Sequence, residues 1–198
     1  MARVIAALFL IAIAPARIEA QRDMRASREE IAAQHRAQGD SLRAAGDRGS
    51  AIGWYRDAIA ADPDDALSYE RLGRVFLERD ALGDARSAFE AGVTRRPDHG
   101  PLWVGLAETL ERMGAMDEAA RALRELTRRT PDELDAWRAR AALAMRRGAW
   151  SEALACYRRI GDEEAQRNVI ALRFLVGTND PVRRCDARSE VRRALCER

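Results

Sequence analysis

Residues 66–99 read ALSYERLGRVFLERDALGDARSAFEAGVTRRPDH, and residues 100–133 read GPLWVGLAETLERMGAMDEAARALRELTRRTPDE. When these two 34-residue stretches are aligned without a gap, similar residues fall in the same columns. A small residue, a large apolar residue and a proline recur in phase: Ala85 and Ala119, Phe89 and Leu123, Pro97 and Pro131. Several columns in phase at one period predict an internal repeat.

The same columns continue at steps of 34 residues on both sides of these stretches. They hold alanines, large apolar residues, a second set of small residues and prolines: Ala51, Ala85, Ala119 and Ala153; Tyr55, Phe89, Leu123 and Tyr157; Gly39, Gly73, Ala107 and Ala141; Pro63, Pro97 and Pro131. The fourth unit lacks the proline. We therefore divide the repeat region, residues 32–165, into four units: 32–65, 66–99, 100–133 and 134–165.

The columns have a physical interpretation. Ala, Leu, Arg and Glu dominate the sequence and favour helices, whereas the β-branched residues that favour strands are sparse. Each unit is therefore expected to form two antiparallel helices, A and B, which approach closely at the small columns, while the large column fills the space between units. Left-handed glycines would make the turn between them: Gly46, Gly114 and Gly148. The prolines should end helix B, and the Asp that follows each of them, such as Asp64, should cap the next helix A.

Period and columns together resemble the tetratricopeptide repeat, whose pattern is W-x2-L-G-x2-Y…A-x3-F…P over 34 residues. The second and third units carry the resemblance best: Tyr69, Leu72, Gly73, Phe76, Ala85, Phe89 and Pro97, then Trp103, Leu106, Ala107, Leu110, Ala119, Leu123 and Pro131. The first unit has His35 in place of the aromatic residue, and the fourth has Arg140 in place of leucine. The resemblance implies an all-α fold: a right-handed superhelical stack of about four helix-turn-helix units, closed by C-terminal capping helices.

The resemblance also implies a binding site, because helices A of this family line a concave groove that takes a peptide or helix of a partner protein. The lining positions correspond here to Arg36, Asp40, Glu70, Arg74, Val104, Glu108, Arg138 and Ala142. The family's chaperone-binding members hold a terminal carboxylate with Lys, Arg and Asn, but this sequence has no Lys and no Asn at those positions. We expect a scaffold for a protein or peptide partner, for example in envelope complex assembly. The alternative is a structural protein that self-associates through its repeats or its C-terminal tail.

The N-terminus has the layout of a secretory signal peptide. A basic start at Arg3 precedes an unbroken apolar run over residues 4–14, which Pro15 ends, and the segment Ile18-Glu19-Ala20 offers neutral Ile18 and small Ala20 at the cleavage positions. The run is too short for a stable membrane span, which needs about 20 apolar residues. We expect cleavage after Ala20 and an exported protein, periplasmic or secreted, with residues 21–31 leading into the first helix. An uncleaved interfacial anchor is the alternative.

The sequence contains no constellation that indicates catalysis. It has two His and lacks the P-loop, G-x-S-x-G, H-E-x-x-H and C-x-x-C motifs. The formal net charge is +2, with acids interleaved among the arginines, which argues against nucleic acid as a partner. We therefore expect no enzyme activity, no catalytic residue, no cofactor and no metal site.

The C-terminal region, residues 166–198, should contain a capping helix and a basic helix. The capping helix is expected over residues 162–176 with Asp162 as its cap, and the basic one should begin at Pro181. An oxidising compartment favours pairing among the three cysteines, Cys156, Cys185 and Cys196. In one continuous helix the last two would lie about 16 Å apart, beyond the ~7 Å that a disulfide spans. Either the tail bends or Cys156 pairs with one of them, and the spacing leaves both open.

Overall fold

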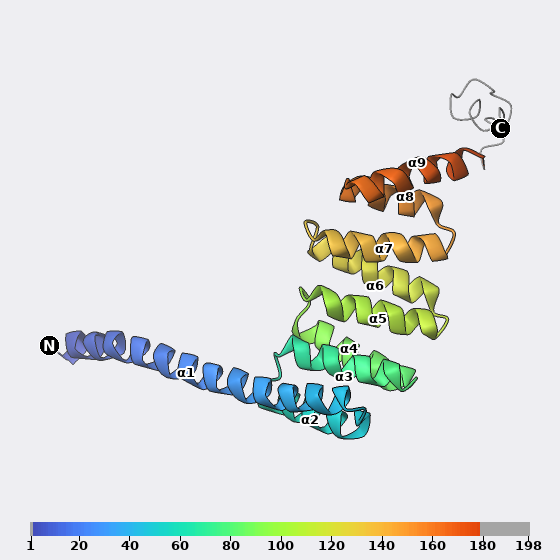
Figure 1. Ribbon diagram of the computed structural model, residues 1–198. Coiled ribbons are helices and arrows are strands. Elements are labelled where there is room, and N and C mark those ends of the chain that lie inside the picture. Colours follow the sequence, from blue (N-terminus) through green and yellow to red (C-terminus); the bar gives the residue numbers. More distant parts are fainter. Residues whose placement is uncertain (1, 179–198) are drawn as a thin grey trace. The chain divides into compact units, whose positions relative to one another are not determined.

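The computed structural model describes residues 2–178, and within them the chain forms nine α-helices and no strand (Figure 1). The helices are α1 (Ala2–Ala44), α2 (Arg48–Ala61), α3 (Ala66–Glu78), α4 (Leu82–Arg95), α5 (Gly100–Arg112), α6 (Met116–Arg129), α7 (Leu134–Arg146), α8 (Trp150–Ile160) and α9 (Glu163–Thr178). The expected all-α fold is confirmed. The expected basic helix from Pro181, with Cys185 and Cys196, lies outside the described residues. The chain divides into two compact units, residues 1–113 and 114–198.

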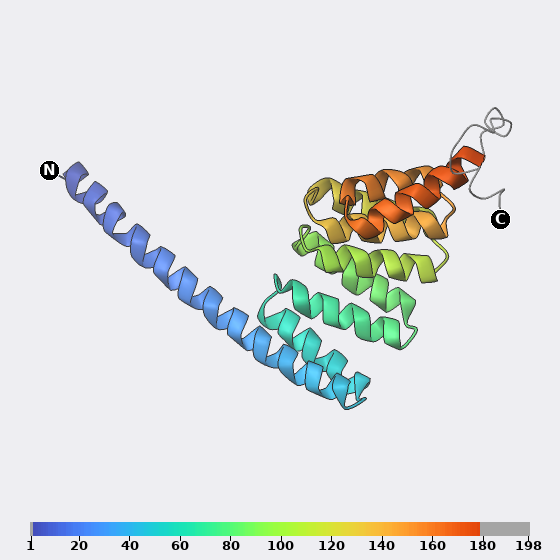
Figure 2. The same cartoon turned by 45° about the horizontal axis from the view of Figure 1, so that its top comes forward.

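The first unit is built from helix pairs. Helix α1 packs against α2 and helix α3 against α4, as helices A and B of the first two repeats should, and α5 follows as the next helix A. Helix α3 also contacts both α1 and α5, so the three helices A lie next to one another (Figures 1 and 2). Side chains on this shared face can therefore meet across helices that are about 34 residues apart in the sequence.

Left-handed residues make the turns between helices A and B, as expected. Gly46, Gly114 and Gly148 have φ of 89°, 79° and 70°. In the second repeat the same position is occupied by Asp80, with φ of 57°. Aspartate tolerates this conformation better than most residues with a side chain, which explains why the turn persists there without glycine.

The core of the first unit consists of aromatic rings packed against glycines. Tyr55 and Phe89 have no exposed surface. A Cβ atom added to Gly39 would lie 2.6 Å from Tyr55 Cε1, and one added to Gly73 would lie 2.5 Å from Phe89 Cζ. At Gly105 the Cβ would lie 2.3 Å from Phe89 Cε1, so this ring fills the space between the second and third repeats. The alanine column is equally buried, with no exposed surface at any member: Ala51, Ala85, Ala119 and Ala153.

The prediction that the Asp after each proline caps the next helix A is wrong. The residue that caps α3 is Asp65, one position later, and its side chain accepts a hydrogen bond from the Leu67 backbone N–H at 3.2 Å. The equivalent residues before α5 and α7 are His99 and Glu133, and neither caps through its side chain. The turn after proline is one residue longer than we assumed, which moves the cap position.

Helix α1 continues toward the N-terminus past the end of α2 (Figure 2). Residues 21–31, expected as a lead-in, belong to this helix because they contain no Gly or Pro and consist mostly of good helix formers. All of them are exposed, and Ala32 is the first buried residue of α1 among those whose side chains are described. Among the described residues no helix is both long enough and apolar enough to cross a membrane.

In the second unit, the capping helix is present as expected. Helix α9 packs on α8, and its Leu172 joins a buried cluster with Ala144, Ala153 and Leu154. Asp162 caps it, because the Asp162 carboxylate accepts a hydrogen bond from the Ala165 backbone N–H at 2.7 Å. Cys156 of α8 is buried, and burial raises the pKa of its thiol.

Candidate binding groove

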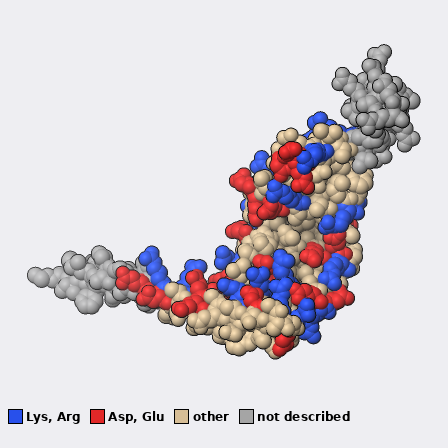
Figure 3. All heavy atoms as spheres, in the orientation of Figure 1, with Lys and Arg blue, Asp and Glu red and all other residues tan. Residues whose placement is uncertain are grey.

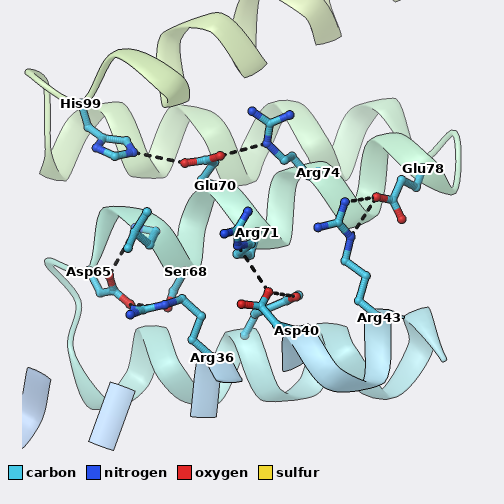
Figure 4. A network of polar contacts seen from close by, with 12 residues as sticks. Arg36, Asp40, Arg43, Asp65, Ser68, Glu70, Arg71, Arg74, Glu78 and His99 are labelled. Atoms are coloured by element: carbon cyan, nitrogen blue, oxygen red, sulfur yellow. Dashed lines mark hydrogen bonds and ion pairs between the residues drawn. The ribbon is translucent and has the colours of Figure 1, made fainter. Parts of the chain in front are cut away.

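The shared face of α1, α3 and α5 carries a network of ion pairs (Figure 4). At one end of α3, Asp65 accepts hydrogen bonds from the guanidinium of Arg36 on α1 and from the Ser68 hydroxyl, the latter at 2.5 Å. Asp65 also caps the N-terminus of α3. The same carboxylate therefore begins α3 and links it to α1 through Arg36.

In the middle of α1, Asp40 accepts a hydrogen bond from the Tyr55 hydroxyl at 2.7 Å. Burial, together with this carboxylate, raises the pKa of Tyr55 above its usual range. Arg71 of α3 extends toward Asp40, with Nε 3.3 Å from the same carboxylate oxygen (Figure 4). The Nε–H group is buried and donates no hydrogen bond to any described residue.

Glu70 of α3 is the most buried carboxylate on this face, with 7% of its surface exposed. Its Oε2 lies 3.3 Å from Nε2 of His99, which precedes α5, and its Oε1 accepts a hydrogen bond from Arg74 Nε at 2.9 Å. The His99 hydrogen bond and then the Arg74 guanidinium lower the pKa of Glu70 to about 2. Glu70 is therefore a charged, structural link between α3 and the start of α5.

A hollow of about 470 Å³ opens between the C-terminal ends of α1 and α3 and the start of α2. Glu78 binds two of its arginines, accepting hydrogen bonds from Arg43 Nε at 2.9 Å and from Arg48 Nε at 3.0 Å. The Arg43 hydrogen bond, followed by the one from Arg48, lowers the pKa of Glu78. The hollow is lined by Asp40, Arg43, Ala44, Arg48, Arg71 and Glu78.

A second hollow, of about 160 Å³, adjoins the first and reaches α5. Arg112 of α5 lines this hollow and donates hydrogen bonds to the Leu77 carbonyl at 2.9 Å and to Asp80 Oδ1 at 2.7 Å. These bonds link α5 to the C-terminal end of α3. It is lined by Arg43, Arg74, Leu77, Glu78, Glu108 and Arg112. The two hollows share Arg43 and Glu78, and we refer to them together as the A-helix groove.

Six of the eight positions expected to line a groove lie in the first unit, on α1, α3 and α5: Arg36, Asp40, Glu70, Arg74, Val104 and Glu108. Asp40, Arg74 and Glu108 line the A-helix groove, whereas Arg36 and Glu70 are held in ion pairs beside it. Val104 lies half-buried on α5.

The other two expected positions, Arg138 and Ala142, lie on α7 in the second unit. Ala142 is half-buried. Arg138 donates to Asp135 at 2.7 Å and to Asp162 at 2.8 Å. Arg138 therefore joins α7 to the start of the capping helix α9.

Sequence reasoning missed part of the groove wall. The expected positions follow one helix face over two turns, and the residues one turn further, Glu78 and Arg112, were omitted although they continue the same spacing of four. Arg43 and Arg71 lie one position off these columns and reach the groove through their long side chains. The spacing could have identified the first pair, but nothing in the sequence distinguishes the second pair from other arginines.

The face of the first unit seen in Figure 3 carries basic and acidic side chains intermixed, without a patch of one sign. The groove follows this pattern, with five arginines and three acids in its lining. Such a surface favours a partner segment that itself carries both charges.

Comparison with known families assigns this architecture to a class. Two family models match the chain, both described as tetratricopeptide repeat, over residues 36–101 and 76–143. Together they span more than half of the 198 residues. The chain therefore belongs to the tetratricopeptide repeat family.

Solved structures support the fold. The crystal structure of MamA matches with a TM-score of 0.57 and 20% identity, covering 72% of this chain and 86% of that one. YrrB, described as a TPR protein with an unusual peptide-binding site, matches with a TM-score of 0.54 and 17% identity over 74% and 78% of the two chains. The first TPR of Spaghetti, bound to the HSP90 peptide SRMEEVD, matches with a TM-score of 0.54 and 13% identity over 61% and 98%. A comparison with curated protein sequences finds no significant match.

Proposed function

We propose that this protein is a non-catalytic binding scaffold that holds a segment of a partner protein in the A-helix groove. The observation that carries the proposal is the pair of adjoining hollows lined by α1, α3 and α5, with Arg48 at the start of α2. Two proteins of the same fold, YrrB and the first TPR of Spaghetti, have a peptide-binding site or a bound peptide. Repeat solenoids in general use the surface formed by equivalent helices as a binding face.

The groove suits a polar segment better than an apolar helix. Of its ten lining residues only Ala44 and Leu77 are apolar, and Leu77 is itself buried. Arginine is favoured where a partner's carboxylate or carbonyl must be held, because its planar guanidinium offers several donors in a fixed geometry. Affinity would then come from hydrogen bonds and ion pairs more than from buried apolar area.

We further propose that the protein acts outside the cytoplasm, after a signal peptide is cleaved between Ala20 and Gln21. The apolar run and the residues before Ala20 are typical of a signal peptide. Ala32 is the first buried residue of α1 among those whose side chains are described. A mature chain that begins at Gln21 would therefore keep the whole described core.

A steric block tests the groove independently of its charges. Ala44 is exposed and lines the first hollow, so Ala44→Tyr should fill the groove without changing its charge. Ala60 is exposed on helix B α2, and Ala60→Tyr is the matched control. Affinity capture from the native envelope fraction should recover the same partner with the unchanged protein and with Ala60→Tyr, and lose it with Ala44→Tyr.

A partner that binds both variants equally would show that the groove is not the site. Light scattering of the purified protein tests the rival function, self-association. A monomer supports the scaffold, whereas a stable dimer that Ala44→Tyr dissociates would show that the groove holds a second copy of the chain.

A further inference from the structure

Arg71 is the groove residue whose hydrogen-bonding capacity is least used. Its guanidinium forms an ion pair with Asp40 at 3.3 Å but donates no hydrogen bond to any described residue, and its Nε is buried. By contrast, Arg43, Arg48, Arg74 and Arg112 each donate at least one hydrogen bond to a neighbouring acid. The Nε is buried and out of reach, but the Arg71 side chain as a whole is 34% exposed, so an acceptor from outside would bind the terminal Nη groups of the guanidinium. Arginine presents these donors in a fixed, planar geometry that suits a carboxylate.

Glu108 is the complementary case among the acids. It is exposed on α5 and lines the second hollow, and no described residue forms an ion pair with it. The other acids of the groove, Asp40 and Glu78, are each paired with arginine. Glu108 is therefore available to a cation from outside the chain.

The linings of the two hollows carry the same formal charge, because each contains three arginines and two acids. The hollows differ in the sign of the side chain whose interactions are least used. In the first hollow this side chain is the cation Arg71, and in the second it is the carboxylate Glu108. Among the described residues the groove therefore offers a cation on α3 and a carboxylate on α5 to charges from outside the chain.

We propose, resting on the proposed function, that the partner segment is extended and carries both charges in a fixed arrangement: an acidic side chain at Arg71 and a Lys or Arg side chain at Glu108. Neighbouring packed helices lie roughly 8–10 Å apart, and an extended chain advances about 3.3 Å per residue. The two charged residues of the partner are therefore separated by two to four positions. A purely acidic segment would leave Glu108 without its partner and is disfavoured.

Selection from a displayed library of random twelve-residue peptides tests this arrangement with a defined probe. The immobilised protein should enrich peptides that carry Asp or Glu and Lys or Arg two to four positions apart, in one consistent order. The neutral variant Arg71→Gln with Glu108→Gln removes two charge-assisted contacts and should bind the best enriched peptide more than about tenfold more weakly, because the loss of one such contact already corresponds to about tenfold. The swapped variant Arg71→Glu with Glu108→Arg should enrich the reverse order.

The matched control reverses the charge of one arginine and of one acid, both on helices B. Asp57 of α2 and Arg95 of α4 are exposed, and Asp57→Arg with Arg95→Glu should enrich the same peptides as the unchanged protein. Circular dichroism establishes whether each variant is folded. If the swapped variant does not fold, the neutral variant alone tests the charge arrangement.

The outcomes separate this inference from the proposed function. Enriched peptides without the paired charges, or peptides whose binding the neutral variant leaves unchanged, would overturn the charge arrangement while leaving a peptide-binding groove. If no peptide is enriched above an unrelated control protein, neither the arrangement nor the proposed function stands.

Discussion

Gly73 leaves room for the ring of Phe89, and this contact makes a prediction at the scale of one residue. A Cβ atom there would lie 2.5 Å from Phe89 Cζ, a ring without exposed surface that cannot move aside freely. Gly73→Ala should therefore destabilise the protein by about 1–3 kcal/mol, the usual cost of overpacking. Gly53 is the control: its Cβ would meet nothing within 4 Å, so Gly53→Ala in α2 should stabilise by roughly 0.5–1 kcal/mol. Urea denaturation measures both, and a Gly73→Ala midpoint at or above that of the unchanged protein would contradict the packing.

Glu70 gives a second prediction at this scale, because its charge is needed inside the first unit. Replacing Glu70 with Gln should lower the free energy of unfolding at pH 7 by about 1–3 kcal/mol, the range for losing hydrogen bonds to charged groups. Glu30→Gln, at an exposed position of α1, should have almost no effect.

The pH dependence of this difference follows from the pKa of Glu70, which is about 2 in the folded protein and ordinarily 4.5. A carboxyl group whose folded pKa is lowered stabilises the protein above its unfolded pKa, and the stabilisation is lost as the pH falls through the folded pKa. The stability difference between the unchanged protein and Glu70→Gln should therefore be complete above pH 5 and shrink between about pH 4.5 and 2. A difference that stays constant over this range would show that the Glu70 charge is not responsible.

At the scale of the element, the beginning of α3 depends on Asp65. Its carboxylate accepts hydrogen bonds from the Leu67 backbone, from the Ser68 hydroxyl and from Arg36 of α1. Asp65→Ala should lower the free energy of unfolding by at least the ~1–2 kcal/mol of a lost helix cap. Asp64→Ala, one residue earlier on an exposed side chain, should change it by less than about 0.5 kcal/mol. Thermal unfolding of the two variants measures both changes. Equal losses of stability in the two variants would mean that Asp65 is not the cap of α3.

The helices themselves could be predicted, because each repeat column reflects a local requirement. Glycine permits the turns at Gly46, Gly114 and Gly148, and proline ends helices B. The partners of the charged side chains could not be predicted in the same way. Arg43 reaches Glu78, 35 residues away, and many other acids lie within reach of a flexible arginine in an unfolded chain. The candidate groove positions could therefore be placed on a helix face, but their pairing, and so the open capacity of Arg71 and Glu108, requires the structure.

At the scale of the whole molecule, the layout of the N-terminus predicts which residues the mature protein contains. We expect the protein to be exported and its mature form to begin at Gln21, because the residues before it have the layout of a signal peptide. Intact-mass measurement of the protein recovered from its native compartment should give the mass of residues 21–198. A mass that retains residues 1–20 would argue for the uncleaved interfacial anchor instead.

If a partner protein occupies the A-helix groove, site-specific photo-crosslinking in the native cell should capture it there. A photoreactive amino acid replaces Ala44, which lines the groove, or Ala60, which is exposed on helix B α2. We expect a specific cross-linked product of higher mass from position 44 and none from position 60. A product from position 60 alone would contradict it, and a product from position 44 with twice the mass of the chain would show that the groove binds a second copy.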